Sequence, residues 1–260
     1  MTVLESIIEG VLEDLANRKM SSTQLDELIS LAPKVRSAID SLSKNKFSVI
    51  AEVKRSSPSK GQLAQIAQPD ELASSYETAG ASVVSVLTEQ RRFSGSLADL
   101  QAVKNAVTIP VLRKDFIVNE YLVRESRAYG ADLMLLIVAA LDEVQLRDLY
   151  QLSTELGMQT LIEVHDEKEL EIALNLDPAI IGVNSRNLKT LDIDLSNFSK
   201  LLPLIPSSIY RIAESGILNA GDAALAFESG ADAILVGESL VKSGAPQLAI
   251  AEFLNIGRRD

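Results

Sequence analysis

The stretch FSVIAEVK (residues 47–54) is a short β-branched run that ends in charged residues. It predicts a strand covered on both faces, because such strands are apolar almost throughout. Successive runs of this kind begin 19 to 34 residues apart, which is the length of a strand, a helix and two short loops. The seven further runs are SVVSVL (82–87), IPVLR (109–113), DLMLLIV (132–138), TLIEV (160–164), AIIGV (179–183), IYRIA (209–213) and DAILVG (232–237).

Eight βα units in about 210 residues are the number found in a (β/α)8 TIM barrel, and this is the α/β fold that we expect. A faint internal repeat supports the alternation, since three helical stretches end in Gly-Ala before a strand, at Gly80, Gly130 and Gly230. Glycine there supplies a left-handed helix C-cap. The competing fold, a doubly wound open sheet, usually has a GxGxxG turn after its first strand, and EVKRSSPSKG (52–61) is not one.

The first 47 residues have a different pattern. VLESIIEGVLEDLANRK (3–19) carries apolar residues with a four-residue spacing, which predicts one amphipathic helix. Ser21 and Gln24 form a capping-box pattern, so a second helix is expected to begin there. We therefore expect a single domain over 1–260, with a helical extension in 1–47 and the barrel from about residue 48.

Composition excludes several classes of protein. The 260-residue chain has a net charge of −11, so broad attraction to nucleic acid or to an anionic membrane is not expected. It has no cysteine and a single histidine, His165, which excludes disulfides, thiolate nucleophiles and His- or Cys-rich zinc sites. The apolar stretch Leu133 to Leu141 is too short to span a bilayer, and Glu5 interrupts any signal-peptide pattern. We expect a cytoplasmic protein.

Polar residues gather where the expected strands end, which is the catalytic face of a barrel. Any one of these charges is also explained as a solvated loop residue, and their concentration at one rim is what predicts a site. They are Glu52, Lys54, Ser56, Lys114, Glu163, Asn184, Arg186, Glu214, Ser215, Gly216, Gly237, Glu238 and Ser239.

ESGI (214–217) and GESL (237–240) each place a glycine and a serine in a loop that opens a helix. Such loops bind anions through backbone N–H groups, and the loops after strands 7 and 8 are where barrels commonly bind phosphate. Turn chemistry with N-capping by Ser215 or Ser239 explains either segment alone, and their occurrence together favours phosphate. Lys60, in the loop after the first strand, is suited to a mobile lid.

Two lysines and three glutamates at this rim form an acid and base set that needs no metal. We expect the glutamates to keep Lys54 and Lys114 protonated, and the ammonium groups to keep the glutamates ionised. A Schiff-base lysine is the alternative use, but it requires a depressed pKa, which neighbouring carboxylates oppose. His165 is expected in the loop after the fifth strand, with a structural role rather than a catalytic one.

The motifs of this chain resemble, in order and spacing, the conserved blocks of indole-3-glycerol phosphate synthase. The resemblance runs from about Phe47 to Val241, and the helical extension is similar as well. The blocks are IAEVKRSSPSKG (50–61), FSGSLADL (93–100), PVLRKDFIV (110–118), GADLMLLI (130–137), LIEVHDEKEL (161–170), IIGVNSRNLKTL (180–191), AESGI (213–217) and GADAILVGESLV (230–241).

The resemblance implies a (β/α)8 enzyme of tryptophan biosynthesis, a carboxy-lyase without a cofactor. Its reaction converts 1-(2-carboxyphenylamino)-1-deoxyribulose 5-phosphate to indole-3-glycerol phosphate by ring closure, decarboxylation and dehydration. By resemblance, Lys114 is the general acid of ring closure and Glu163 transfers a proton in dehydration. Lys54 holds the substrate carboxylate or acts as a second acid, Glu52 orients both lysines, and Asn184 contacts substrate and intermediate. The implied substrate-binding residues are Ser56, Phe93, Phe116, Arg186, Glu214, Ser215, Gly216, Gly237, Glu238 and Ser239.

Three residues depart from the pattern of the family. Ser185 and Asn187 stand where NNRDL or NTRDL is usual, and Ala213 stands where SESGI is common. The neighbouring Asn184, Arg186 and Glu214 are retained, so the departures concern the support of the site rather than its chemistry.

Other functions remain open at this point. Phosphoribosylanthranilate isomerase and the tryptophan synthase α subunit also bind phosphate in loops 7 and 8, although Lys54, Lys114 and Glu163 argue against them. A catalytically silent barrel that binds a metabolite is a further alternative. We expect a small phosphorylated substrate, no nucleic-acid or membrane partner, and a monomer or weak homo-oligomer that is able to associate with other enzymes of the pathway.

Overall fold

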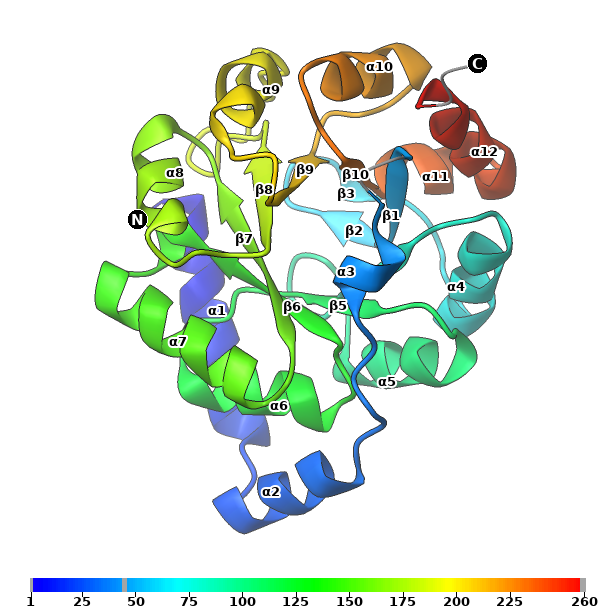
Figure 1. Ribbon diagram of the computed structural model, residues 1–260. Coiled ribbons are helices and arrows are strands. Elements are labelled where there is room, and N and C mark those ends of the chain that lie inside the picture. Colours follow the sequence, from blue (N-terminus) through cyan, green and yellow to red (C-terminus); the bar gives the residue numbers. More distant parts are fainter. Residues whose placement is uncertain (1, 44–45, 258–260) are drawn as a thin grey trace.

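A closed barrel of eight parallel strands forms the centre of the computed structural model, which describes residues 2–43 and 46–257 (Figure 1). The order of the strands around the barrel follows the chain, and the last strand pairs with the first. Each begins within two residues of its expected start, so the predicted fold is confirmed. The strands are β1 (Ser48–Val53), β4 (Val83–Leu87), β5 (Val111–Lys114), β6 (Leu133–Ile137), β7 (Gln159–Val164), β8 (Ile180–Asn184), β9 (Tyr210–Glu214) and β10 (Ala233–Val236).

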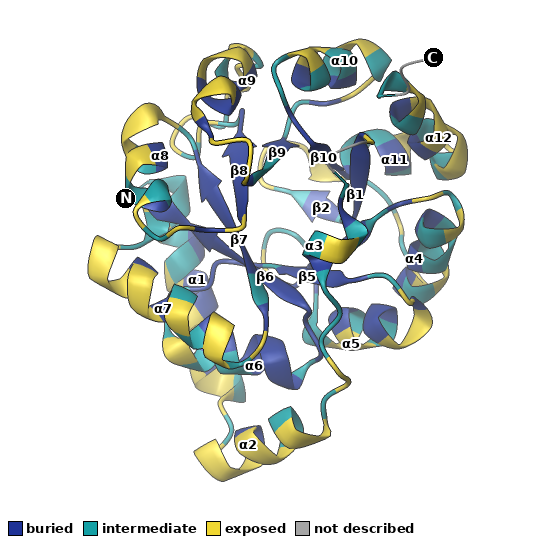
Figure 2. Ribbon diagram, in the orientation of Figure 1, coloured by how far each residue is buried: buried dark blue, intermediate teal, exposed yellow. Residues whose placement is uncertain are grey.

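Helices surround the barrel, with exposed outer faces and buried inner faces (Figure 2). They are α4 (Pro69–Thr78), α5 (Leu97–Ala106), α6 (Glu120–Ala128), α7 (Glu143–Glu155), α8 (Glu167–Leu174), α9 (Ser196–Leu201), α10 (Ala220–Glu228), α11 (Glu238–Lys242) and α12 (Pro246–Ile256), with 3-10 turns η1 (Val138–Ala140) and η2 (Leu202–Leu204). The loop after β1 contains an antiparallel hairpin of β2 (Ser56–Ser57) and β3 (Gly61–Gln62), which the sequence did not predict. None of the helices described is long and apolar enough to cross a membrane.

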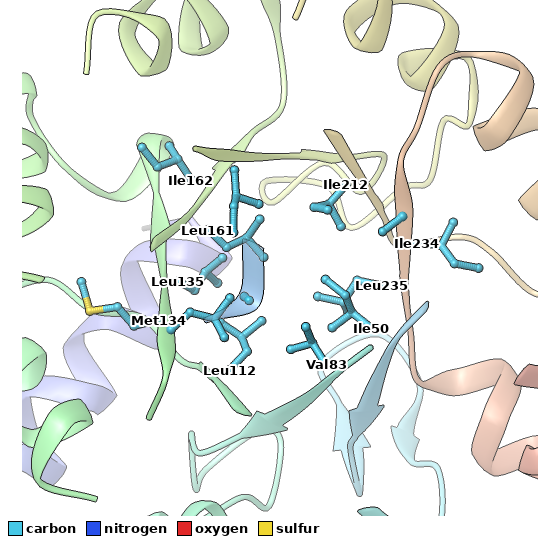
Figure 3. Packing of buried hydrophobic residues seen from close by; sticks show 14 of the residues in the cluster. Ile50, Val83, Leu112, Met134, Leu135, Leu161, Ile162, Ile212, Ile234 and Leu235 are labelled. Atoms are coloured by element: carbon cyan, nitrogen blue, oxygen red, sulfur yellow. The ribbon is translucent and has the colours of Figure 1, made fainter. Parts of the chain in front are cut away.

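Apolar side chains fill the barrel interior. Figure 3 shows Leu112, Leu135 and Leu161 in the middle of the barrel, each at most 2% exposed. Met134 and Ile162, one residue along from Leu135 and Leu161, point outward, because successive side chains of a strand alternate between its faces. The centre is therefore a packed core, and a binding cavity has to lie at one end of the barrel.

The Gly-Ala repeat has a structural role. Gly80, Gly130 and Gly230 follow α4, α6 and α10 with φ of 98°, 88° and 102°, as expected for left-handed C-caps. In two of the three repeats an aspartate comes next: Asp132 accepts the backbone N–H of Val111, and Asp232 accepts that of Arg211. These carboxylates tie the start of one strand to its neighbour at the N-terminal end of the barrel.

The N-terminal extension forms α1 (Val3–Arg18), α2 (Ser22–Leu31) and α3 (Ala38–Ser41). The predicted apolar face of α1 is buried at Ile7, Val11 and Leu15, and the capping box at the start of α2 is present. Arg18 makes two hydrogen bonds of 3.0 Å to Glu125 of α6, so the end of α1 is fixed on the outside of the barrel.

The segment between α2 and α3 is held against the N-terminal end of the barrel. Arg36 donates its backbone N–H to Asp132 at 2.7 Å and its guanidinium to the carbonyls of Ile109 and Lys104. Asp132 also pairs with the buried ammonium of Lys104 at 2.5 Å. One carboxylate therefore connects the extension, α5 and the start of β5.

We expect Asp132→Ala to lower the free energy of unfolding by about 3–5 kcal/mol, because it leaves the buried ammonium of Lys104 without its partner. Urea unfolding followed by circular dichroism measures this loss. Asp148→Ala is the matched control, since Asp148 is 60% exposed and its nearest cation, Arg147, is 3.8 Å away. Equal stabilities for the two variants would contradict the anchoring role.

Candidate active site

A cavity of about 140 Å³ opens at the C-terminal end of the barrel. The strand ends bring together most of the predicted site residues there, because parallel strands place all their C-terminal ends on one rim. Those that line the cavity are Glu52, Lys54, Phe93, Lys114, Phe116, Glu163, Asn184, Arg186, Glu214, Ser215, Gly216, Gly237 and Glu238.

Lys114, the last residue of β5, lies between two buried carboxylates. Its Nζ is 2.7 Å from Glu214 Oε2 and 3.2 Å from Glu163 Oε2. Burial alone would lower the pKa of Lys114, but the charges of Glu214, Glu163 and Glu52 outweigh it and raise the pKa well above its usual range. Lys114 is thus held as an ammonium, as predicted, and this excludes its use as a Schiff-base nucleophile at neutral pH.

Arg113, which precedes Lys114 in β5, helps to fix the strand from the face that points away from the cavity. Arg113 points away from the cavity and is completely buried. Its guanidinium donates to Asp115 at 3.0 Å, Glu125 at 2.9 Å and Thr88 at 3.1 Å. Because Glu125 also binds Arg18, the charges behind β5 link the strand that carries Lys114 to both α6 and α1.

Glu163 of β7 is ionised. Burial would raise the pKa of this carboxyl, but Lys114 and His165 outweigh burial and hold the pKa well below its usual range. His165 follows β7 in the loop, as expected, with its Nε2 3.3 Å from Glu163 Oε1 and its Nδ1 2.9 Å from Glu169 Oε2. Burial would lower the pKa of His165, but these two glutamates raise it to about 10.

Glu214 of β9 differs from the expectation that all three glutamates are ionised. Burial raises the pKa of Glu214. The negative charges of Glu163 and Glu52 raise this pKa further, and Lys114 offsets these effects only in part, so the pKa is about 7. Among the described residues, Glu214 Oε1 has no hydrogen-bond partner. The physical reason for the difference is that Lys114 is shared between two carboxylates, and only Glu163 has a second cation.

Room for Glu214 comes from a glycine on the neighbouring strand. A Cβ atom on Gly182 of β8 would lie 2.0 Å from Glu214 Oε1. Gly237 serves Glu52 in the same way, since a Cβ there would lie 2.7 Å from Glu52 Oε1. Glu52 in turn pairs at 2.5 Å with Lys54, which directly follows β1.

One wall of the cavity is apolar. The rings of Phe93 and Phe116 lie 6.2 Å apart at 39°, beside Leu135 and Ile137 of β6. Val3, Leu4 and Ile7 of α1 also line the cavity, which the sequence did not predict. Their helical spacing indicated a buried face, but no feature of the sequence showed that the face meets the rim.

Two predicted residues, Ser56 and Ser239, do not line the cavity. The Ser56 hydroxyl donates to the Arg92 carbonyl at 2.7 Å, in the structure around the β2–β3 hairpin. The Ser239 hydroxyl is buried in α11 and has no hydrogen-bond partner in the part of the chain described. Ser215 and Gly216, which do line it, have φ of 68° and 75°. Glycine adopts this left-handed conformation freely, so the backbone strain at the rim lies at Ser215.

Polar contacts connect the loops around the cavity to one another. Lys60 of the β2–β3 turn pairs with Glu238 across the opening at 2.5 Å, and Arg186 donates to Ser59 in the same turn at 3.3 Å. The unusual Ser185 donates to the Ser215 carbonyl at 3.0 Å, and Asn187 accepts the N–H of Lys189 at 2.8 Å. Ser185 and Asn187 therefore support loops, and Ala213, the third departure, is fully buried in β9; none of the three lines the cavity.

Within residues 2–43 and 46–257, no group of three or more histidine, cysteine, aspartate and glutamate side chains is arranged to hold a metal ion. The functional groups of the cavity are those of an acid and base site.

A family model described as indole-3-glycerol phosphate synthase matches residues 4–253. The chain belongs to the indole-3-glycerol phosphate synthase family. The indole-3-glycerol phosphate synthase of Mycolicibacterium smegmatis is 51% identical over 98% of this chain and 95% of that protein. The enzymes of that name from Rhodococcus opacus and Streptomyces griseus are 50% and 51% identical over 99% of this chain and 96% of theirs.

A solved structure with the same fold is the thiamine phosphate pyrophosphorylase of Pyrococcus furiosus, with a TM-score of 0.61 over 82% of this chain and 96% of that one. Its sequence identity is only 14%, so the likeness supports the barrel and nothing about the reaction. The family assignment of indole-3-glycerol phosphate synthase rests on the sequence.

Gly182→Ala should push the Glu214 carboxylate away from β8 and weaken its contact with Lys114. We expect a loss of about 1–3 kcal/mol in the free energy of unfolding, the usual cost of overpacking, together with a lower kcat. Gly10→Ala in α1 is the control, because its new Cβ meets only the flexible side chain of Arg91, at 3.1 Å. Unfolding in urea and steady-state kinetics of both variants give the comparison; a Gly182→Ala protein with native stability and kcat would show that the carboxylate is not confined.

Proposed function

We propose that the chain forms indole-3-glycerol phosphate from 1-(2-carboxyphenylamino)-1-deoxyribulose 5-phosphate, with Lys114 as general acid and Glu163 as general base. The observation that carries the assignment of roles is the ammonium of Lys114 at the cavity wall, flanked by Glu163 and Glu214. One group is held protonated and its neighbour ionised, so a proton donor and a proton acceptor face the same space.

Ring closure requires a proton donor. As the aromatic carbon attacks the ribulose carbonyl, negative charge develops on the carbonyl oxygen, and Lys114 transfers a proton to it. Glu214, with a pKa of about 7, is suited to return a proton to Lys114. Carbon dioxide then leaves from the ring carbon that carried the carboxylate, a step that needs no proton.

Dehydration requires both kinds of group. An acid protonates the departing hydroxyl so that it leaves as water, and a base removes the proton whose loss restores the aromatic ring. Glu163 is ionised and supplies the base, while Lys54 or Lys114 supplies the acid. Glu52, which pairs with Lys54 at 2.5 Å, orients that lysine, and Asn184, which accepts the Arg186 N–H at 2.9 Å, contacts the intermediate.

The two ends of the substrate match different walls of the cavity. Phe93, Phe116 and the α1 residues offer an apolar surface for the anthranilate ring. The loops after β9 and β10, with Ser215, Gly216 and Gly237 at the cavity, are proposed to bind the phosphate. Ser239, two residues after Gly237, does not line the cavity, but its buried hydroxyl has no partner in the described chain, and we propose it as a further donor to the phosphate.

Residues 1–260 are proposed to act as one domain. Support comes from α1, which belongs to the extension by sequence and lines the cavity in space. A monomer or a weak homo-oligomer is the proposed form, with association with other enzymes of the pathway as a further possibility to test by sedimentation.

We expect Lys114→Ala to lower kcat by roughly 10²- to 10⁴-fold with the fold intact, the usual contribution of a general acid. Indole formation is followed by fluorescence in chelator-treated buffer, with circular dichroism as the check of folding. Glu163→Gln should also abolish most of the turnover, because it removes the base without changing the shape of the side chain. Near-normal turnover in Lys114→Ala would contradict the role of Lys114 as general acid. If the unsubstituted protein bound the substrate without turning it over, the chain would be a catalytically silent barrel.

Ser239→Asp should weaken substrate binding, because it places a negative charge beside the proposed phosphate loops. We expect KM to rise at least about tenfold with a smaller change in kcat, since an uncompensated charge repulsion of 1.4 kcal/mol corresponds to a factor of about ten. Ser229→Asp, at the end of α10, is the control for an added charge. An unchanged KM in Ser239→Asp would move the phosphate site elsewhere.

A further inference from the structure

His165 contacts the carboxylate that we propose as the base, on the side opposite the lysine. Lys114 Nζ lies 3.2 Å from Glu163 Oε2, and His165 Nε2 lies 3.3 Å from Glu163 Oε1. The imidazole itself does not line the cavity. Its effect on the reaction therefore has to pass through Glu163.

The imidazole is fixed from behind by Glu169, in the first turn of α8. Glu169 Oε2 accepts the backbone N–H of His165 at 2.8 Å and lies 2.9 Å from its Nδ1. Asn197 of α9 donates to the His165 carbonyl at 3.3 Å. Backbone and ring are both held, so the ring cannot turn away from Glu163 without breaking these bonds.

This geometry also sets the charge of the ring. Each of the two ring nitrogens of His165 faces a carboxylate, Glu163 on one side and Glu169 on the other. The Nδ1 contact with Glu169 has hydrogen-bond geometry, whereas the Nε2 contact with Glu163 is an ion-pair distance without a hydrogen bond in the described chain. A negative charge beside each nitrogen favours the protonated form of the ring. The contacts thus form a row of alternating charge from Glu169 through His165 and Glu163 to Lys114, with Glu214 at its end.

The difference between the two glutamates beside Lys114 supports a specific role for this row. Glu163 and Glu214 are 2% and 1% exposed and contact the same ammonium. Yet the pKa of Glu163 is held well below its usual range, whereas that of Glu214 is about 7. Lys114 from β5 acts on both carboxyl groups, and Glu52 from β1 acts on Glu214. His165 is a second cation for Glu163 alone among the described residues.

We propose that His165, clamped by Glu169, is a positioning residue that fixes the orientation and the negative charge of Glu163. The inference rests on the proposed function in one respect, that Glu163 is the base of the reaction. Without the imidazolium, Glu163 and Glu214 would compete for one ammonium, and the proton would be distributed between them. His165 thereby determines which of the two carboxyl groups accepts a proton from the substrate.

The first test needs no variant, because His165 is the only histidine of the chain. In the untagged protein, the imidazole signals in a nuclear magnetic resonance titration belong to this residue alone. We expect the ring to stay protonated at pH 8 and to titrate near the pKa of about 10. Titration close to the ordinary histidine value of about 6.5 would overturn the proposal, since a neutral ring cannot fix the charge of Glu163.

Kinetics of two variants separate positioning from a role in stability alone. His165→Gln keeps an N–H donor but removes the charge, and Glu169→Gln weakens the clamp. We expect kcat at pH 7 to fall by roughly ten- to a hundredfold in His165→Gln, the acid limb of the kcat profile to move up by about one pH unit, and KM to change less than about threefold. Glu169→Gln should shift the profile in the same direction by less.

The control is Glu171→Gln, which removes a carboxylate from an exposed position on the same helix and should leave the profile unchanged. The inference would be overturned if His165→Gln and Glu169→Gln both kept the native pH profile of kcat and Glu163→Gln was inactive. Full activity of Glu163→Gln would instead remove the base from the proposed function, so the two failures are distinguishable.

Discussion

Closure of the barrel is the constraint on which the rest of the structure depends. Once β10 pairs with β1, every strand must deliver its C-terminal residue to the same rim. Glu163 and Glu214, which are far from Lys114 in the sequence, then lie 3.2 Å and 2.7 Å from its Nζ. Glu163 and Glu214 repel each other when both are ionised. The hydrogen bonds between the strands keep β7 and β9 in place and so hold the two carboxyl groups near Lys114.

Buried ion pairs are arranged around both ends of this frame. Asp132 and Lys104 fix the extension at the N-terminal end, and Arg113 with Glu125 secures the strand behind Lys114. Such pairs add little net stability, because desolvation offsets most of their attraction, but breaking one of them is costly. We infer that they serve mainly to define where β5 and its neighbours lie.

The strands and the acidic and basic residues of the rim could be predicted because each depends on local pattern. The hairpin of β2 and β3 could not, since two-residue strands have no periodicity. The approach of α1 to the cavity is a tertiary contact of Ile7 with residues far along the chain. The raised pKa of Glu214 could not be predicted either, because it depends on Lys114 being shared between Glu163 and Glu214. The contacts of His165 could not be predicted, because Glu169 reaches the ring only once α8 has formed.

The contact between α1 and α6 also bears on how the protein is made. Arg18 finds its partner Glu125 after a separation of 107 residues. During synthesis the first helix leaves the ribosome long before α6 exists, so its apolar face has no native surface to cover until about half the chain has followed. Contacts so distant in sequence close slowly. The residues of α1 that line the cavity are therefore synthesised first but reach their native contacts late.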